Sequence, residues 1–111
     1  MNDALASLLD MLPRGRGRAR TRKALAAELG TTDREISRLT AELVGGGYPV
    51  GTTRRGGGGV FLCENETEKQ ECAGMYVATI VSLARRLRAF DRAAYERIAG
   101  QGLLPFMRDA G

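Results

Sequence analysis

The sequence contains neither histidine nor tryptophan, and its two cysteines are Cys63 and Cys72 among 111 residues. Histidine is the side chain most often used for acid–base catalysis near neutral pH and for metal binding, so its absence argues against an enzyme, a metal site and a bound cofactor. Two cysteines cannot build a disulfide scaffold or a four-ligand zinc site within one chain. We interpret them as reduced, intracellular thiols, with a redox switch as the alternative.

Aromatic residues make up 5% of the chain, and no run of apolar residues is long enough to span a bilayer. Leucine, isoleucine, valine and alanine must therefore fill the core, which favours a helical one. Residues 1–12 lack both the basic leader and the apolar core of a signal peptide. We expect a single soluble, cytoplasmic domain.

The charges are grouped in blocks along the chain. The 17 basic residues outnumber the 13 acidic ones, and residues 14–62 hold ten of the bases with four of the acids, a local net charge of +6. Residues 63–72 hold four acids and one lysine. Fifteen of the 17 bases are arginine, whose planar guanidinium suits phosphate groups and guanine edges. This distribution predicts a polyanionic partner, with nucleic acid as the leading hypothesis.

Three short amphipathic helices are predicted in the first half of the chain. Leucines at helical spacing follow Asn2 and Asp3, either of which could cap the first helix, and Pro13 ends this helix. Thr21 is a candidate cap for a second helix, which ends at Gly30. Residues 32–35 read T-x-x-E, a capping box for a third helix that runs to about Val44. The apolar residues expected to face the core are Leu5, Leu8, Leu9, Leu12, Leu25, Ala26, Leu29, Ile36, Leu39 and Leu43.

Residues 48–63 are predicted to form a β-hairpin. The β-prone stretches 48–52 and 60–63 flank residues 53–59, which contain two arginines and four glycines. We expect these central residues to form the basic tip of the hairpin. Residues 14–20, which read RGRGRAR, are expected to form an exposed basic loop with a short strand near Arg20.

Residues 64–100 are predicted to form one long helix, because its acidic start suits a helix N-terminus and no proline interrupts the stretch before Gly100. Asn65 or Thr67 would cap it. The apolar residues recur at alternating steps of three and four, namely Ala73, Tyr76, Ile80, Leu83, Leu87, Phe90 and Ala94. This heptad pattern is typical of a dimerising helix, although the same residues could fold back on the chain's own core. The tail 101–111, apolar at residues 103–107, could be frayed, docked or swapped.

The small residue Ala26, the turn residue Gly30 and the β-branched Ile36 stand at the spacing of the helix-turn-helix family, and the match covers residues 21–44. With the hairpin, the chain resembles a winged helix. The stretch DREISRLTAEL, followed by GYPV, is similar to small phage or prophage DNA-binding proteins. The resemblance implies an α+β, mostly helical fold with a winged helix at 1–63, the long helix at 64–100 and the tail at 101–111. The glycine run 56–59 departs from it, since related wings usually carry an aromatic after paired glycines.

By this resemblance, the chain is a non-catalytic regulator of transcription or replication that binds double-stranded DNA sequence-specifically. Helix 32–44 would enter the major groove, and the tip 53–59 would meet the backbone or the minor groove. The residues expected to contact DNA are Arg22, Lys23, Thr32, Arg34, Ser37, Arg38, Arg54 and Arg55. Arg34 or Arg38 can contact guanine in a bidentate manner, and the alternative is that both pair with Glu35 or Glu42 on a solvated face. The two arginines of the tip could instead serve only solubility.

Arg14, Arg16 and Arg18 are candidates for a phosphate or minor-groove contact. Residues 13–16 are similar to the core of an AT-hook, but we favour a simple charged loop that touches phosphate, with the hook as the alternative. A homodimer would pair through the long helix, and its candidate interface residues are Tyr76, Ile80, Leu83, Leu87 and Phe90.

Two other functions compete with DNA binding. The first is a protein adaptor that binds its partner through the long helix. The second, an RNA binder, ranks last because the chain lacks stacking aromatics. We expect no membrane partner and no small-molecule ligand.

Overall fold

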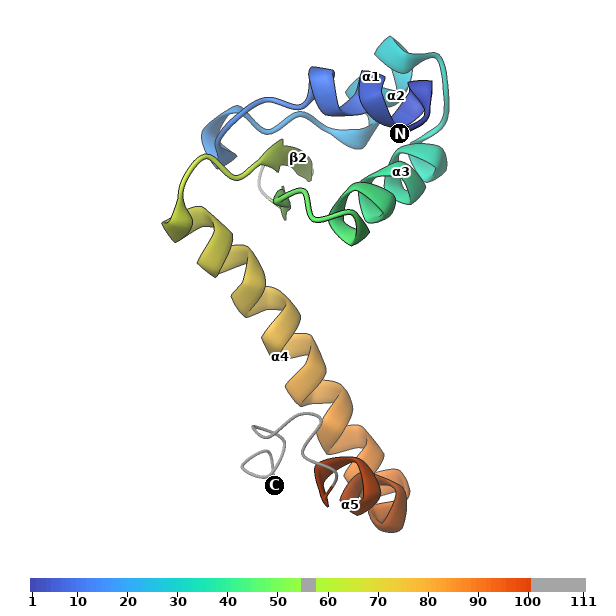
Figure 1. Ribbon diagram of the computed structural model, residues 1–111, viewed down its shortest axis with the longest axis vertical. Helices are drawn as coiled ribbons and strands as arrows, with labels where there is room; N and C mark the ends of the chain where they lie inside the picture. Colours follow the sequence, from blue (N-terminus) through green and yellow to red (C-terminus); the bar gives the residue numbers. More distant parts are fainter. Residues whose placement is uncertain (55–57, 101–111) are drawn as a thin grey trace. The chain divides into compact units, whose positions relative to one another are not determined.

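The computed structural model describes residues 1–54 and 58–100 and gives a mostly helical α+β fold with one antiparallel hairpin (Figure 1). The elements in chain order are α1 (Asp3–Met11), the 3-10 turn η1 (Arg16–Arg18), α2 (Arg22–Leu29), α3 (Asp33–Gly45), β1 (Val50–Thr53), β2 (Gly59–Leu62), α4 (Glu66–Phe90) and α5 (Arg92–Gly100). The chain divides into two compact units, residues 1–72 and residues 73–111. We call them unit 1 and unit 2.

Each of the first three helices begins at a polar cap that the sequence predicted. Asn2 Oδ1 accepts a hydrogen bond from the Leu5 amide, and the Thr21 and Thr32 hydroxyls accept from the third amide beyond them, at 3.1 Å in both cases. These bonds satisfy amides that have no partner within a helix start. Gly30 ends α2 in the left-handed conformation, with φ of 74°, which glycine adopts without a steric penalty.

The core of unit 1 lies between the three helices and the hairpin. α3 contacts both α1 and α2, and it also contacts β1. The predicted inward face of α3 is confirmed, since Ile36, Leu39 and Leu43 are all buried. The buried residues of this cluster are Leu8, Leu12, Leu25, Ala26, Ile36, Leu39, Leu43, Val50 and Val60. Burial of one face of each helix fixes which of its side chains point outward.

The hairpin is confirmed, and a third piece of backbone pairs with it. Val50 lies opposite Leu62, and Thr53 lies opposite Gly59. Arg20 exchanges both of its backbone hydrogen bonds with Val60, at 3.1 and 2.7 Å, and forms an isolated bridge where a short strand was expected. The expectation of an exposed loop at 14–20 holds for Arg14, Gly17 and Arg18, but it was wrong for Gly15, which is buried, and for Arg16, which binds the start of α4.

The prediction of one continuous helix over 64–100 was wrong. α4 ends at Phe90, and the Asp91 carboxylate accepts a hydrogen bond from the Ala94 amide, 3.1 Å away, at the start of α5. Aspartate competes with the helix backbone for nearby amides, so it favours a helix start over a helix interior. In unit 2, α5 packs on α4 through Ala84, Tyr95 and Ala99, with Val81, Leu87 and Ile98 around them.

The start of α4 belongs to unit 1. Asn65 caps the helix by accepting from the Glu68 amide, as predicted. The two cysteines are free thiols, with Cys63 half-buried and Cys72 buried, and their sulfur atoms lie 3.9 Å apart. Burial raises the pKa of the Cys63 thiol to about 11, and the neighbouring thiol of Cys72 adds to this effect.

Gly51 tests how tightly the hairpin packs against these residues. A Cβ at Gly51 would lie 2.7 Å from Cys72 Sγ and 2.7 Å from the Phe61 ring. We expect Gly51→Ala to lower the free energy of unfolding by about 1–3 kcal/mol, measured by chemical denaturation, because a buried contact of this length forces the neighbours apart. Gly45→Ala is the matched control, since its Cβ would meet open space at the end of α3. Equal stabilities of the two variants would contradict the packing.

The thiol of Cys63 gives a second test, read out as its alkylation rate. With a pKa of about 11, the thiol at pH 8 should react with iodoacetamide roughly 100-fold more slowly than an ordinary cysteine of pKa about 8.5, because only the thiolate reacts. Between pH 7 and pH 10 the rate should keep rising about tenfold per pH unit. Mass spectrometry of the Cys63 peptide measures this rate, with the urea-unfolded chain as the control. A rate that levels off near pH 9 would contradict the raised pKa.

Candidate nucleic-acid interface

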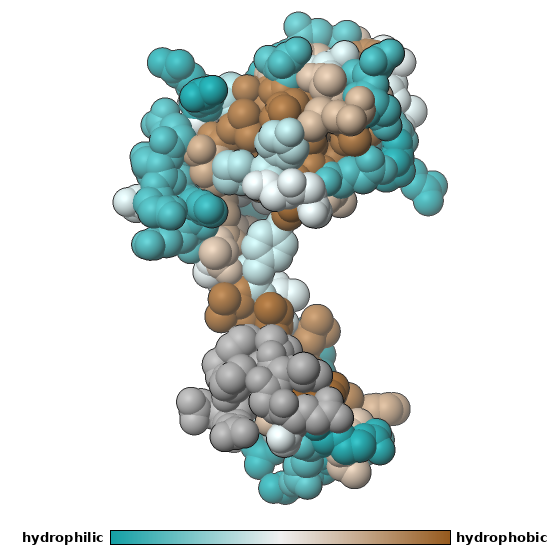
Figure 2. All heavy atoms as spheres, viewed as in Figure 1, coloured by the Kyte–Doolittle hydropathy of each residue, from teal (hydrophilic) through white to brown (hydrophobic). Residues whose placement is uncertain are grey.

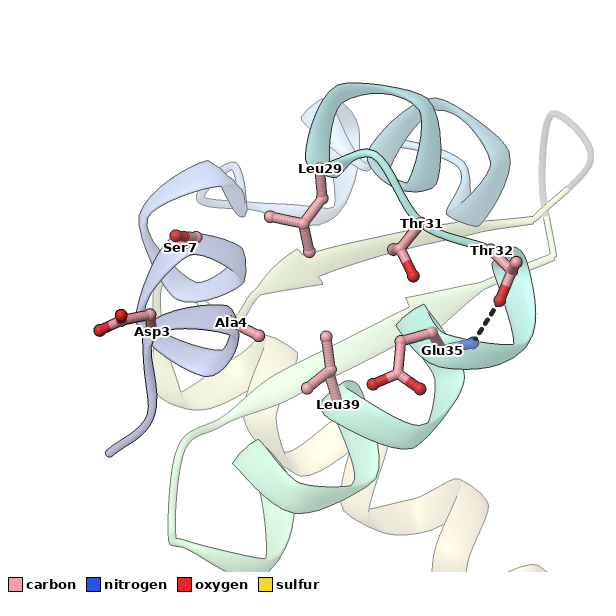
Figure 3. Close-up of a pocket in the computed structure, with 8 residues that line it drawn as sticks. All are labelled: Asp3, Ala4, Ser7, Leu29, Thr31, Thr32, Glu35 and Leu39. Atoms are coloured by element: carbon pink, nitrogen blue, oxygen red, sulfur yellow. Dashed lines mark hydrogen bonds between the residues drawn. The ribbon is translucent and has the colours of Figure 1, made fainter.

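The outer face of α3 carries the polar residues that the helical periodicity predicted for it. Its inner face is buried against α1, α2 and the hairpin, so the opposite face is directed outward. The exposed side chains at the start of α3 and on this face include Thr32, Asp33, Arg34, Ser37, Arg38 and Ala41. Thr32 itself has a structural task, because its hydroxyl caps the helix (Figure 3).

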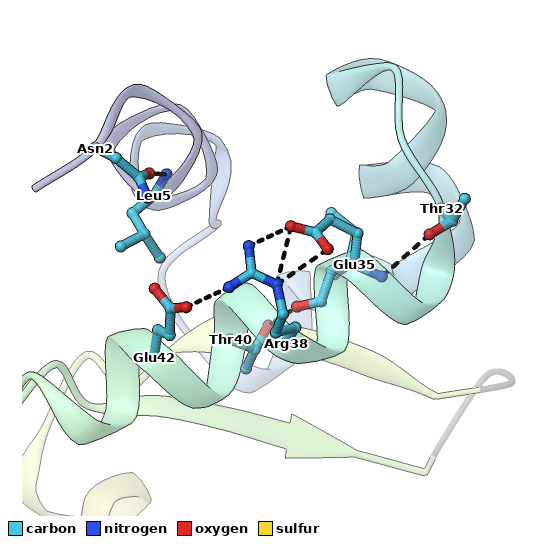
Figure 4. Close-up of polar contacts among 8 residues, drawn as sticks. Asn2, Leu5, Thr32, Glu35, Arg38, Thr40 and Glu42 are labelled. Atoms are coloured by element: carbon cyan, nitrogen blue, oxygen red, sulfur yellow. Dashed lines mark hydrogen bonds and ion pairs between the residues drawn. The ribbon is translucent and has the colours of Figure 1, made fainter.

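Arg38 is held by two carboxylates of its own helix (Figure 4). Its Nε donates to both oxygens of Glu35, at 3.0 and 3.1 Å, and its two terminal nitrogens bind Glu35 and Glu42. These hydrogen bonds hold the pKa of the Glu35 carboxyl below its usual range and raise the pKa of Arg38. For Arg38, the alternative of pairing with Glu35 and Glu42 on a solvated helix face is therefore the correct one. The carboxylate of Glu35 binds Arg38 and not the start of α3, so the cap at Thr32 is a single hydrogen bond and not a reciprocal box.

Arg34 differs from Arg38 in this respect. It is exposed, and it forms no ion pair with any residue that the structure describes. One helical turn separates Arg34 from Arg38, and Ser37 lies exposed between them. α3 as a whole holds three acids and two arginines, a net charge of −1. Its outward face therefore presents one uncommitted guanidinium, that of Arg34, and not two.

Further basic side chains lie at the start of α2. Arg22 and Lys23 occupy its first two positions, just after the Thr21 cap. The Nε atom of Arg22 is buried and makes no hydrogen bond within the described part of the chain. Arg20, just before the helix, pairs with Glu28 at 2.5 Å. The positive end of the helix dipole disfavours cations at a helix start, so Arg22 and Lys23 gain nothing from α2 itself.

The three arginines of residues 14–18 have different surroundings. Arg16 pairs with Glu71 at 2.5 Å, lies over the Phe61 ring, and its amide donates to Glu68. The hydrogen bond with Glu71 raises the pKa of Arg16. Arg14 and Arg18 are both exposed. Because residues 16–18 form a 3-10 turn, they are not the extended segment that an AT-hook requires, and the simple charged loop fits better.

At the tip of the hairpin, Arg54 is exposed, whereas Arg55 lies outside the described residues.

An open pocket of about 510 Å³ lies between α1, the turn before α3 and the first turns of α3 (Figure 3). Leu29 and Leu39 form its apolar part, and Asp3 and Glu35 contribute carboxylates. These acids disfavour a phosphate in the pocket. Among the described residues, no group of three or more cysteine, aspartate or glutamate side chains is placed to hold a metal ion.

The candidate dimer residues on α4 fall into two groups. Tyr76, Leu83 and Phe90 are 58%, 54% and 88% exposed, whereas Ile80 and Leu87 are half-buried. Leu87 packs on the cluster that joins α4 to α5, so this residue is partly buried within its own chain and does not face a second copy. Met75 and Val77 are also exposed and were not among the predicted residues. No helix in the described ranges is both long enough and apolar enough to cross a membrane.

Comparison of the chain with protein-family models, with curated proteins and with solved structures finds no match. The proposed function therefore rests on the residues themselves.

Proposed function

We propose that unit 1 binds double-stranded DNA as a winged helix, with α3 in the major groove, and serves as a regulator of transcription or replication. The observation that carries this proposal is the exposed guanidinium of Arg34, which forms no ion pair with the described residues, on the outward face of α3 next to the hydroxyl of Ser37. The inward face of α3 is locked in the core, and Gly30 sets a tight turn between α2 and α3. A helix presented in this way can offer its N-terminal half to base edges.

Arg34 is the residue that reads a base in this proposal. An arginine outside any ion pair can donate two hydrogen bonds to O6 and N7 of guanine without first breaking a salt bridge. Arg38 has to leave Glu35 and Glu42 before it can do the same. While the pair is closed, Arg38 instead neutralises carboxylates that would repel the phosphate backbone.

The start of α2 supports the proposal, because its charges suit a phosphate. Arg22 and Lys23 stand beside the first amides and the positive end of the α2 dipole, where an anion is favoured. A phosphate there would supply acceptors to both side chains. In helix-turn-helix geometry the first of the two helices crosses the backbone, which is the place where such contacts are needed. Arg54 on the hairpin is a further phosphate contact in this proposal.

We expect Arg34→Ala to lower sequence preference more than total affinity. Removal of one bidentate contact should reduce discrimination at one base pair by about 1–3 kcal/mol, which is roughly fivefold to 150-fold. Selection from a random duplex pool, followed by binding measurements on the enriched site and on variants of it, measures this effect. Arg97→Ala removes the same charge from α5, where the proposal places no DNA contact, and is the control. An enriched motif that is unchanged by Arg34→Ala would contradict the assignment of Arg34.

The double variant Arg22→Gln and Lys23→Gln should weaken binding to all duplex sequences alike. For every phosphate that the variant no longer neutralises, the slope of log K against log salt should fall by about 0.9, because fewer counterions are released on binding. Binding titrations at several salt concentrations give the slope, and circular dichroism confirms that the helices remain. An unaltered slope would refute the phosphate contact.

The outcome of the selection also separates the two classes of function. If the unaltered chain bound no duplex DNA even at low salt, the DNA proposal would fail, and the adaptor hypothesis would become the better explanation of unit 1.

A further inference from the structure

The middle of α4 is an uncharged helical segment with a large exposed apolar surface. The 13 residues from Cys72 to Ala84 contain no charged side chain. Within them, Met75, Tyr76, Val77 and Leu83 are 48%, 58%, 47% and 54% exposed. Figure 2 shows hydrophobic surface along this part of the chain. A surface helix normally confines apolar residues to its buried face, so this exposure indicates an interaction surface.

The charges at the two ends of this segment are opposite in sign. Residues 64–71 hold four glutamates and one lysine, a net charge of −3. One of these glutamates, Glu71, pairs with Arg16, which leaves an acidic excess. Residues 85–90 hold three arginines and no acid, a net charge of +3. α4 is therefore acidic at its start, uncharged in its middle and basic at its end.

The exposed apolar face is distinct from the face that holds α5. Tyr76, Leu83 and Phe90 are seven residues apart, so they occupy equivalent positions on successive pairs of turns. Ala84, which lies one position beyond Leu83, is buried against α5. The column of Tyr76, Leu83 and Phe90 is thus about a quarter of a turn away from that contact. A second helix can approach this column without displacing α5.

We propose that this face of α4 binds a second copy of the chain, with the two α4 helices antiparallel. The alignment that superimposes the uncharged segments places residue 72 opposite residue 84 of the second copy. In this register Tyr76 lies opposite Ile80, and Leu83 lies opposite Ala73. The same register brings residues 66–71 of each copy, which hold three glutamates and one lysine, beside residues 85–90 of the other. A net charge of −2 thus meets one of +3 at both ends of the pair.

The charges at the two ends of α4 disfavour a parallel pair of helices. It would set the three arginines of 85–90 beside the same three arginines, and the acidic starts beside each other. Like charges at close range oppose association, whereas the antiparallel arrangement converts both ends into attraction. Pairing does not require DNA, so this proposal stands or falls independently of the proposed function. If both hold, one particle carries two α3 helices, and its operators are palindromic.

The oligomeric state in the absence of DNA tests the pairing. Light scattering should give twice the 12.0 kDa of one chain. Leu83→Glu should weaken association roughly tenfold or more, because it places a charge in the apolar contact. Ala78→Glu is the matched control, since Ala78 is exposed on α4 but lies away from the Leu83 column. A single-chain mass for the unaltered protein, or equal association of the two variants, would overturn the proposal.

Cysteine cross-linking tests the orientation. On a background of Cys63→Ser and Cys72→Ala that keeps the mass of the unaltered chain, Thr79→Cys lies near the centre of the antiparallel pair and should form a disulfide-linked dimer on oxidation. Phe90→Cys should not, because its two copies would be about 36 Å apart along the pair, far beyond disulfide reach. In a parallel pair both variants would cross-link equally, and that result would refute the antiparallel arrangement.

Discussion

The burial of one face of α3 is the constraint on which unit 1 depends. Ile36, Leu39 and Leu43 are almost fully withdrawn from solvent, and they pack against residues of α1, α2 and both strands of the hairpin. Because a helix has a period of 3.6 residues, this burial leaves no rotational freedom to α3. The outward direction of Arg34 and Ser37 follows directly from it. The caps at Thr21 and Thr32, with Gly30 between them, then determine where α2 ends and α3 begins.

The arginines illustrate how a folded chain divides one residue type among several tasks. Arg16 is bound to Glu71 and lies over Phe61, so it helps to hold the start of α4 on unit 1. Arg38 is bound within its own helix. Exposed ion pairs of this kind contribute little to stability, but each occupies a guanidinium that would otherwise bind a partner. What remains for a polyanion is the smaller set that includes Arg22 and Arg34.

The apolar residues of α4 are likewise divided between those that contact α5 and those that remain exposed. The seven-residue repeat predicts one continuous face, but Asp91 ends the helix and turns the chain back as α5. Leu87 is drawn into the contact with α5, whereas Leu83 and Phe90 keep most of their surface exposed. A single heptad pattern thus serves an intrachain contact and leaves a face for a second helix. The pattern identifies which residues favour association, but it does not say which of them find a partner within the chain.

Local signals in the sequence determined the caps, the three helices of unit 1, the hairpin and the inward face of α3, because each depends on residues within one or two turns of each other. Long-range contacts decided the rest. The pairing of Arg16 with Glu71 spans more than fifty residues and has no local pattern, so the partial burial of Arg16 within the loop 14–20 could not be predicted. The end of α4 had a local signal in Asp91, but helical periodicity continued through it and outweighed it. The pairing of Arg38 with Glu35 and Glu42 is local to one helix and was an alternative that the sequence offered, but the spacing alone did not show whether Arg34 would pair as well.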